Sequence, residues 1–355
     1  MSWLKRVGAV GTIAAAVAAA SCSESTGPSS VDASASATAV AGLNSSLSQN
    51  GLLQALAALG NVGPLAGPVA RAAMAPMPAP GRPWTAAAAE TRDRLTVLAA
   101  RAPLAPQALF PANVLGKTFQ WDTATDSYRI TDSTLTGAPS NGVEFLLYQV
   151  DTATGEPSLP LTQTGYLTIA DASTPQANIL HVLLKVNSLT AADYTITEVK
   201  TTSSLTLTAA GYVTNIVGNN SPVVNFTLQH VLSLPDSSLA TNYQANTNGT
   251  TVSLVDTVSG GGASPSFALD WSVTKAGTVA ITGSGTDSLI NVQFKFNGTT
   301  VATASGPPDS PSISLASGQA LTTADLLALA TIFTGFAEIE YNLSLLFTPG
   351  LLVFG

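Results

Sequence analysis

The chain has one cysteine and two histidines among 355 residues, and only 10% of its residues are charged. Soluble domains usually carry about 25% charged residues, so this sequence is unusually neutral. One cysteine and two histidines are too few for a structural zinc site of the Cys/His type. The net charge of -8 and the pI near 4.6 leave no basic surface for a phosphate backbone, so nucleic acid is excluded as an expected partner.

Catalytic motifs are also missing. No G-x-S-x-G, H-E-x-x-H or P-loop pattern occurs. Ser272 and Lys275 have the S-x-x-K spacing of serine acylases, but they fall in an expected strand, where positions three apart point to opposite faces. His181 and His230 each lie in apolar strand sequence and are interpreted as sheet histidines. We therefore predict that the protein is not an enzyme and has no catalytic residue, metal or cofactor.

Two acidic segments follow a shared pattern, DTATD from Asp122 to Asp126 and DTATGE from Asp151 to Glu156. A calcium loop needs oxygen ligands at alternate positions, whereas each segment offers only two carboxylates. We interpret both as hairpin turns that are held by Asp and Thr side chains.

The first residues form an export signal. Lys5 and Arg6 are followed by an apolar run from Val7 to Ala20. This run of about 14 residues is shorter than the ~20 that cross a bilayer core, so a cleaved signal is favoured over a permanent membrane helix.

The end of the signal, Ala19-Ala20-Ser21-Cys22, resembles the small-residue box of bacterial lipoproteins, although Ala19 stands where Leu is usual. The resemblance implies that Cys22 is lipidated and that the membrane is a partner through this anchor. Ser23, in place of Asp, resembles lipoproteins that are passed on to the outer membrane. The alternative is an ordinary secretory signal that is cut after Ala20 or Ser21 and leaves a free thiol.

Composition divides the chain into five segments. Ser, Thr, Gly and Pro dominate after the signal, Ala, Leu and Pro come next, and alternating strand sequence follows. The expected segments are a signal peptide (1–21), a flexible tether (22–36), a helical region (37–112), an antiparallel β domain (113–318) and a C-terminal helix with its tail (319–355).

The helical region is expected to hold two short helices. The second runs from after Pro83 to Arg101, with Pro103 as its stop. Its arginines, which include Arg92 and Arg94, are interpreted as a solvated helix face, with docking of an acidic partner as the alternative.

The β domain is expected to be antiparallel, with one apolar and one polar face. Phe267, Leu269, Trp271 and Val273 alternate with polar or small residues, and Ile290 to Phe296 does the same. Ten to thirteen strands are expected, with turn signals at Asn141-Gly142, Gly218-Asn219-Asn220, Asn248-Gly249, Gly260-Gly261-Gly262 and Asn297-Gly298. The aromatic residues of the first hairpins are interpreted as core, with a sugar-stacking or lipid-lining surface as the alternative: Phe119, Trp121, Tyr128, Phe145, Tyr148 and Tyr166.

Helical spacing returns from Leu321 to about Phe347, and Thr322 with Asp325 resembles a capping box at its start. The run between Asp325 and Glu338 holds 12 uncharged residues, which favours a buried helix on the sheet over a membrane span. The predicted fold is mainly β (α+β): a large twisted antiparallel β-meander, curved or closed into a half-barrel, packed with this helix and the short N-terminal helices.

Three functions are compatible with these features. The leading one is a cell-envelope lipoprotein with a non-enzymatic binding or structural role, whose partner is a hydrophobic small molecule on the concave apolar face or another envelope protein. The second is a transmembrane β-barrel of the outer membrane, for which 22 aromatic residues are few. The third is a hydrolase with a dispersed site.

Overall fold

A computed structural model describes residues 33–48, 84–105, 107–149, 157–186, 189–214, 223–260, 265–275, 277–286, 288–307, 311–316 and 323–354. Cys22, the signal and most of the expected tether lie outside these residues. Contacts divide the chain into two compact units. Unit 1 comprises residues 1–45, 78–92 and 235–341, and unit 2 comprises residues 46–77, 93–234 and 342–355.

The protein is mainly β, and its fifteen described strands follow a largely antiparallel meander. The predicted fold class is confirmed. The meander is not closed, because β2 and β15 end the strand order without a further strand partner among the described residues. The strand number exceeds the expected ten to thirteen, since the edge strands β2 and β15 have only three and four residues.

Unit 1 carries seven of the described strands, each antiparallel to the next. In β10, Val252, Leu254 and Val258 are buried, whereas Thr251 and Thr257 are exposed. This alternation is the predicted pattern for a sheet with one covered face. The strands are β9 (Leu239–Thr247), β10 (Thr250–Ser259), β11 (Ser266–Thr274), β12 (Thr278–Thr286), β13 (Ile290–Phe296), β14 (Thr299–Gly306) and β15 (Ser312–Leu315).

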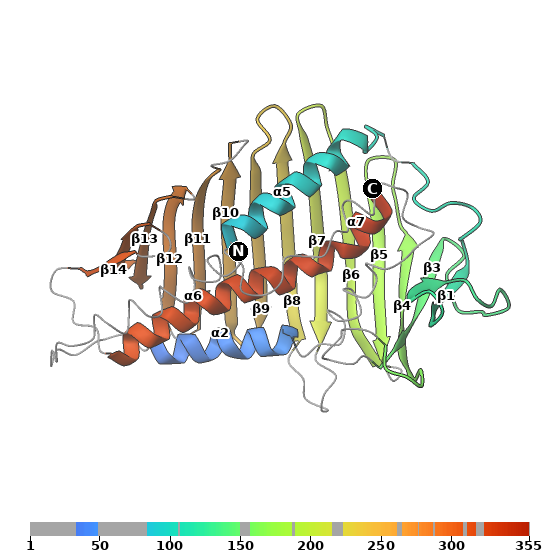
Figure 1. Cartoon of the computed structure of the whole chain (residues 1–355), viewed down its shortest axis with the longest axis horizontal. Coiled ribbons are helices and arrows are strands. Elements are labelled where there is room, and N and C mark those ends of the chain that lie inside the picture. The colour runs from blue at the N-terminus through green and yellow to red at the C-terminus, as the bar shows by residue number, and fades with distance from the viewer. Residues whose placement is uncertain are drawn as a thin grey trace. The chain divides into compact units, whose positions relative to one another are not determined.

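The covered face of unit 1 lies under α6 (Thr323–Ser344) (Figure 1). The indole of Trp271, from β11, is 5.8 Å from the ring of Phe333 and 6.0 Å from that of Phe336, measured between ring centroids. Trp271 is completely buried. The apolar residues of the sheet and of the helix therefore bury each other, as the sequence predicts for this helix.

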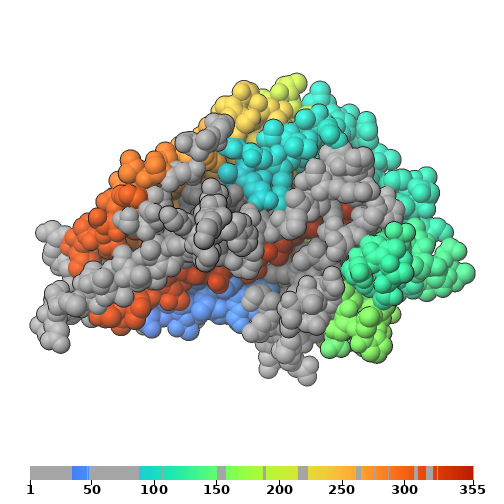
Figure 2. All heavy atoms as spheres, viewed as in Figure 1, coloured from blue at the N-terminus to red at the C-terminus, as the bar shows by residue number. Residues whose placement is uncertain are grey.

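A second helix, α2 (Ala33–Ser48), lies beside α6, as Figure 2 shows for the blue and red segments. The side-chain amide of Asn44 donates a hydrogen bond to the carboxylate of Glu338. Gly335 permits the close approach, because a Cβ there would lie 2.4 Å from Cγ1 of Val40. The helix begins inside the predicted tether, since an Ala-rich sequence that can bury Val40 favours a helix.

Unit 2 carries the remaining eight described strands. All pairs are antiparallel except β1 with β3, because β2 turns back outside β1 and leaves the inner edge of β1 to β3. The strands are β1 (Lys117–Asp122), β2 (Ser127–Arg129), β3 (Gly142–Tyr148), β4 (Gln163–Asp171), β5 (Asn178–Val186), β6 (Leu189–Lys200), β7 (Ser204–Thr214) and β8 (Val223–Ser233).

The end of the chain covers unit 2 as a helix. The 3-10 helix η2 (Leu345–Phe347) leads into α7 (Thr348–Phe354), which contacts β5 and β6. The sequence was compatible with two structures for this tail, an edge strand or a segment that covers the core. The structure shows the second. Gly350 lies so close to β6 that a Cβ would meet Cγ2 of Ile196 at 2.9 Å.

The helix α5 (Trp84–Arg101) has the predicted bounds. Two of its arginines do not belong to the expected solvated face, because Arg92 and Arg94 are only 6% and 8% exposed, whereas Arg101 is exposed as expected. In unit 1, the guanidinium of Arg92 donates a 2.5 Å hydrogen bond to the carbonyl oxygen of Gly260. The long Arg side chain can reach a main-chain acceptor at the end of β10, which helical spacing alone does not reveal.

Two of the predicted turns are confirmed in detail. Asn248 and Gly249 join β9 to β10, and Asn297 and Gly298 join β13 to β14, all with positive φ angles. Such angles suit a type I′ hairpin turn. Asn141 does not form a hairpin turn: it precedes β3 directly, at the end of a long connection.

The helical stretch Thr323–Phe354 is long and apolar enough to cross a membrane, by length and composition alone.

Candidate functional site

The outward face of unit 1, which is the face opposite α6, carries a hollow of about 410 Å³. It lies across β11, β12 and β13. Asp270 pairs with Thr282, and Thr282 pairs with Gln293, so these three side chains form one row across the strands. The lining residues are Leu269, Asp270, Thr282, Gly283, Ser284, Asn291 and Gln293.

The hollow exists because a row of small side chains lies beside the row of longer ones. Ala268 pairs with Ser284, and Ser284 pairs with Asn291. The short Ala and Ser side chains leave space that Asp270 and Gln293 border. At about 300–1,000 Å³, pockets are large enough for a small molecule, so the hollow is within the size of a ligand site.

Hydroxyl and amide groups dominate the chemistry of the hollow. Thr282 and Ser284 can donate and accept hydrogen bonds, and Asn291 and Gln293 do so through their amides. The Gln293 side-chain oxygen accepts a 3.5 Å hydrogen bond from the hydroxyl of Thr300. Asp270 is the single charged residue among the lining residues. The arrangement suits a ligand that is neutral, polar and rich in hydrogen-bonding groups.

The opposite face of unit 1 is covered and does not offer an open surface to a ligand. Its apolar side chains pack against α6 through Trp271, Phe333 and Phe336. A hydrophobic guest on this face would have to replace these ring contacts.

The covered face of unit 1 also holds two acids, of which Asp256 is buried and Glu340 is half-buried with its Oε2 atom buried. Asp256, from β10, is 1% exposed, and Glu340 comes from α6. Burial raises the pKa of Asp256 to about 7. Burial and the charge of Asp256 raise the pKa of Glu340 well above its usual range. The sequence analysis missed this pair because the two acids are 84 positions apart in the chain.

The two histidines are not brought together. In unit 2, His181 lies on the outward face, where its Nε2 is 2.7 Å from a carboxylate oxygen of Asp193. His230 is buried on the covered face, with its ring 4.7 Å from the ring of Phe347. Burial lowers the pKa of His230 to about 3, so this histidine is neutral at physiological pH. Each histidine has a structural partner, as its strand context predicts.

The other predicted sites also have structural roles. Ser272 lies in β11 and Lys275 just after it, so the S-x-x-K spacing falls on a strand as expected. No group of three or more His, Cys, Asp and Glu side chains that could hold a metal ion occurs among the described residues.

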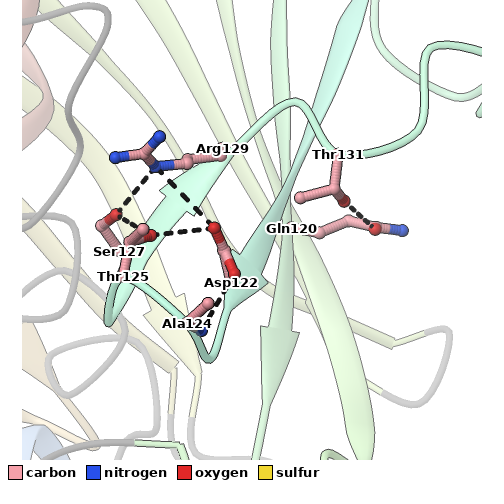
Figure 3. A network of polar contacts seen from close by, with 7 residues as sticks. All are labelled: Gln120, Asp122, Ala124, Thr125, Ser127, Arg129 and Thr131. Atoms are coloured by element: carbon pink, nitrogen blue, oxygen red, sulfur yellow. Dashed lines mark hydrogen bonds and ion pairs between the residues drawn. The ribbon is translucent and has the colours of Figure 1, made fainter.

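The first acidic segment is a hairpin turn, as predicted (Figure 3). The carboxylate of Asp122 accepts hydrogen bonds from the amide of Ala124 at 3.0 Å and from the hydroxyl of Thr125 at 2.9 Å. These bonds, and to a smaller extent the charge of Arg129 at 3.9 Å, lower the pKa of Asp122. The second segment, 151–156, lies outside the described residues.

Most of the aromatic residues of the first hairpins fill the core of unit 2. Phe119 and Phe145 stack at 4.9 Å, and Tyr128 meets Phe145 edge-on at 5.5 Å. Trp121 packs edge-on against Tyr128. Tyr166 pairs with Leu146 and Lys185 on the outward face, so it is not part of this cluster.

Comparison with protein-family models, with curated proteins and with solved structures finds no match to the chain. The functional argument therefore depends on the residues themselves.

Proposed function

We propose that the protein is a lipid-anchored cell-envelope protein that does not catalyse a reaction and that binds a neutral, polyhydroxylated ligand, such as a stretch of glycan, in the hollow of unit 1. The observation that carries the proposal is the lining of this hollow. Hydroxyl and amide side chains, with Asp270 as the single carboxylate, match the hydrogen-bonding groups of an uncharged sugar.

The ligand class differs from the hydrophobic guest that the sequence analysis expected. That guest requires an open apolar face. The apolar side chains of Trp271, Phe333 and Phe336 are instead in contact with each other, whereas the hollow is on the polar face. This arrangement favours a polar ligand.

The anchor is proposed from the resemblance of Ala19-Ala20-Ser21-Cys22 to the lipoprotein box. Lipidation adds ~0.8 kcal/mol of membrane affinity per buried CH₂, and several acyl chains hold a protein stably on a membrane. By the same resemblance, Ser23 supports placement at the outer membrane.

The alternative of a transmembrane β-barrel requires an outward apolar band along the strands. In unit 1, the outward positions include Asn242, Gln244 and Asn246 on β9, and Thr251 and Ser253 on β10. These polar residues weigh against contact with lipid. A hydrolase that cleaves glycans needs a pair of carboxyl groups, and it is disfavoured because Asp270 is the single carboxylate of the lining.

Binding is tested with the full-length protein in mild detergent, by saturation-transfer NMR and calorimetry against cellohexaose, maltohexaose and soluble peptidoglycan fragments. We expect at least one of these probes to bind, and the Asp270→Ala/Gln293→Ala variant to lose at least tenfold in affinity. Thr274→Ala, an exposed change on the same strand outside the lining, is the matched control and should bind as the wild type does.

Absence of binding to all three probes, or binding that survives the double substitution, contradicts a glycan site and leaves the structural role. The anchor is tested separately by labelling with radioactive palmitate in a bacterial host. Label is expected on the wild type and none on Cys22→Ser, and an unlabelled wild-type chain contradicts lipidation.

A further inference from the structure

Asp256 occupies the middle of β10 on the covered face of unit 1. Thr241, from β9, pairs with it directly, and Leu269, from β11, pairs with it on the other side. Tyr243 lies two residues further along β9, on the same face. The carboxyl group therefore points away from the outward face and toward the layer that contains α6.

Glu340 reaches this place from the helix. Residues four apart lie on one face of a helix, so Glu340 lies one turn beyond Phe336. The ring of Phe336 meets Trp271, which pairs with Leu254 on β10. The charges of Glu340 and Asp256 both raise the pKa of Tyr243, which agrees with the three groups lying near one another.

Three carboxyl oxygens of the cluster are buried without a well-formed hydrogen bond. Neither carboxyl oxygen of Asp256, nor Oε2 of Glu340, has a hydrogen-bond partner of normal geometry among the described residues. The hydroxyl of Thr241 is close enough to Asp256 to lower its pKa slightly, against the larger effect of burial. Ionised carboxylates accept hydrogen bonds only, so two ionised acids could not satisfy each other here.

Among the residues that the structure describes, no Lys, Arg or His side chain shifts the pKa of either acid. Thr241 acts on Asp256, Asp256 acts on Glu340, and both acids act on Tyr243. The neighbouring Glu338 of α6 is bonded to Asn44 of α2 instead. The nearest described arginine contact, from α5, ends at the carbonyl oxygen of Gly260 beyond β10.

A metal ion is a poor fit for this cluster. Calcium takes six to eight oxygen ligands and magnesium an octahedral set, whereas the cluster offers two carboxyl groups and two hydroxyls. A proton needs only two acceptors. It converts one acid into a donor, removes one buried charge and leaves one shared negative charge.

We propose that Asp256 and Glu340 share one proton, and that the resulting acid–carboxylate hydrogen bond is a pH-sensitive latch that holds α6 on the sheet of unit 1. Release of this proton to water leaves two buried carboxylates that repel each other. The latch is therefore closed at acidic and neutral pH and weakens in alkaline solution.

The pKa directions agree with this geometry. Both acids bind a proton more tightly in the folded chain than in the unfolded chain, where the ordinary pKa values are 3.8 and 4.5. Their contribution to stability is therefore complete below pH 4 and is lost as the pH rises through the folded pKa values, about 7 for Asp256 and well above the usual range for Glu340, so the last proton of the pair leaves in alkaline solution.

The test measures the thermal midpoint of the full-length protein between pH 5 and 9, together with amide hydrogen exchange of residues 323–341. In the wild type, we expect the midpoint to fall by about 5 °C more than in Asp256→Asn, and exchange in the helix to rise beyond its intrinsic pH dependence. Asp270→Asn changes an exposed Asp on the opposite face and is the matched control, which should follow the wild type.

Sharing predicts that the effects are not additive. In Asp256→Asn or Glu340→Gln alone, the new amide donates to the remaining carboxylate, so each single change removes nearly the whole pH dependence. If the two acids titrated independently, each substitution would remove only part of the pH dependence, and the effects of the two substitutions would add.

A difference infrared spectrum at pH 7 provides the second readout. We expect the protonated-carboxyl band of the wild type to be lost in both single variants. The proposal is overturned if the pH dependence of Asp256→Asn and Glu340→Gln equals that of the wild type, if their effects add, or if the infrared band survives in either. Should Asp256→Asn fail to fold, Glu340→Gln and the infrared spectrum still decide the question.

Discussion

The two units are built alike but bury their polar groups differently. In unit 2, Glu198 is 3% exposed, and its carboxylate accepts a 2.7 Å hydrogen bond from the amide of Asn178. Burial raises its pKa, while Asn178 and the charge of Lys200 oppose the rise. In unit 1, the described residues offer Asp256 and Glu340 neither an amide nor a cation, and only the hydroxyl of Thr241 opposes the effect of burial on Asp256.

The comparison sets fixed donors, which Asn178 provides to one carboxylate oxygen of Glu198, against the shared proton that we propose for Asp256 and Glu340. The first solution depends on neighbouring side chains, and the second depends on the pH. Unit 2 also contains a buried neutral His230, which acid would have to charge. The two units are therefore expected to respond to pH in opposite directions at these sites.

The largest effect is expected from removing the ring that joins sheet and helix in unit 1. Trp271→Ala should lower the free energy of unfolding by about 3–5 kcal/mol, because the lost indole leaves a cavity beside Phe333 and Phe336. Urea unfolding measures the change. Val255→Ala, on the outward face of β10, is the control and should cost under about 1 kcal/mol. Equal losses in the two variants would mean that α6 does not cover this face.

A pH-dependent change is expected next, at His230 of unit 2. As the pH falls from the ordinary histidine pKa of 6.5 toward the folded value of about 3, only the unfolded chain gains the proton. The wild type should therefore lose about 3 kcal/mol between pH 6.5 and 4, a loss that is absent in His230→Phe.

Urea unfolding of both proteins at the two pH values measures this difference. His181→Phe changes the exposed histidine and should keep the acid sensitivity of the wild type. If His230→Phe is as acid-sensitive as the wild type, the prediction that the two units respond to pH in opposite directions is wrong.

The smallest of the three effects concerns the fixed donor of unit 2. Asn178→Ala removes the amide that donates to Glu198 and the oxygen that accepts from the main-chain amide of Gln107. The free energy of unfolding of Asn178→Ala at pH 7 should be about 2 kcal/mol lower than that of the wild type. The double variant with Glu198→Gln should recover part of the loss, because it removes the buried charge. No recovery would indicate that Asn178 stabilises the unit only by packing.

Local signals made much of the fold predictable. The alternation in residues 267–273 and 290–296 placed two strands, and Asn248-Gly249 and Asn297-Gly298 placed two hairpin turns. Residue spacing carries this information because a strand repeats every two residues and because few residue types tolerate a positive φ. The bounds of α5 were found in the same way, from its composition and the following proline.

The candidate sites were much less predictable. Asp270, Asn291 and Gln293 read only as the polar side of two strands, and the hollow depends on the register that sets them beside Ala268 and Ser284. The sequence does show small residues on the neighbouring strands. These residues indicate a hollow only when it is known which strand positions pair with each other. The burial of Arg92 and Arg94 was missed for the same reason.

The sequence by itself determined the class of fold, two of the hairpin turns, the bounds of α5, the lack of catalytic motifs and the resemblance of the first 22 residues to a lipoprotein signal. These features depend on neighbours along the chain. The tertiary structure alone decided that Trp271 packs against Phe333 and Phe336, that the polar face of unit 1 is hollowed, and that the charge of Asp256 acts on Glu340. Contacts of this kind join residues far apart in sequence, because register and helix packing, and not local propensity, bring them together.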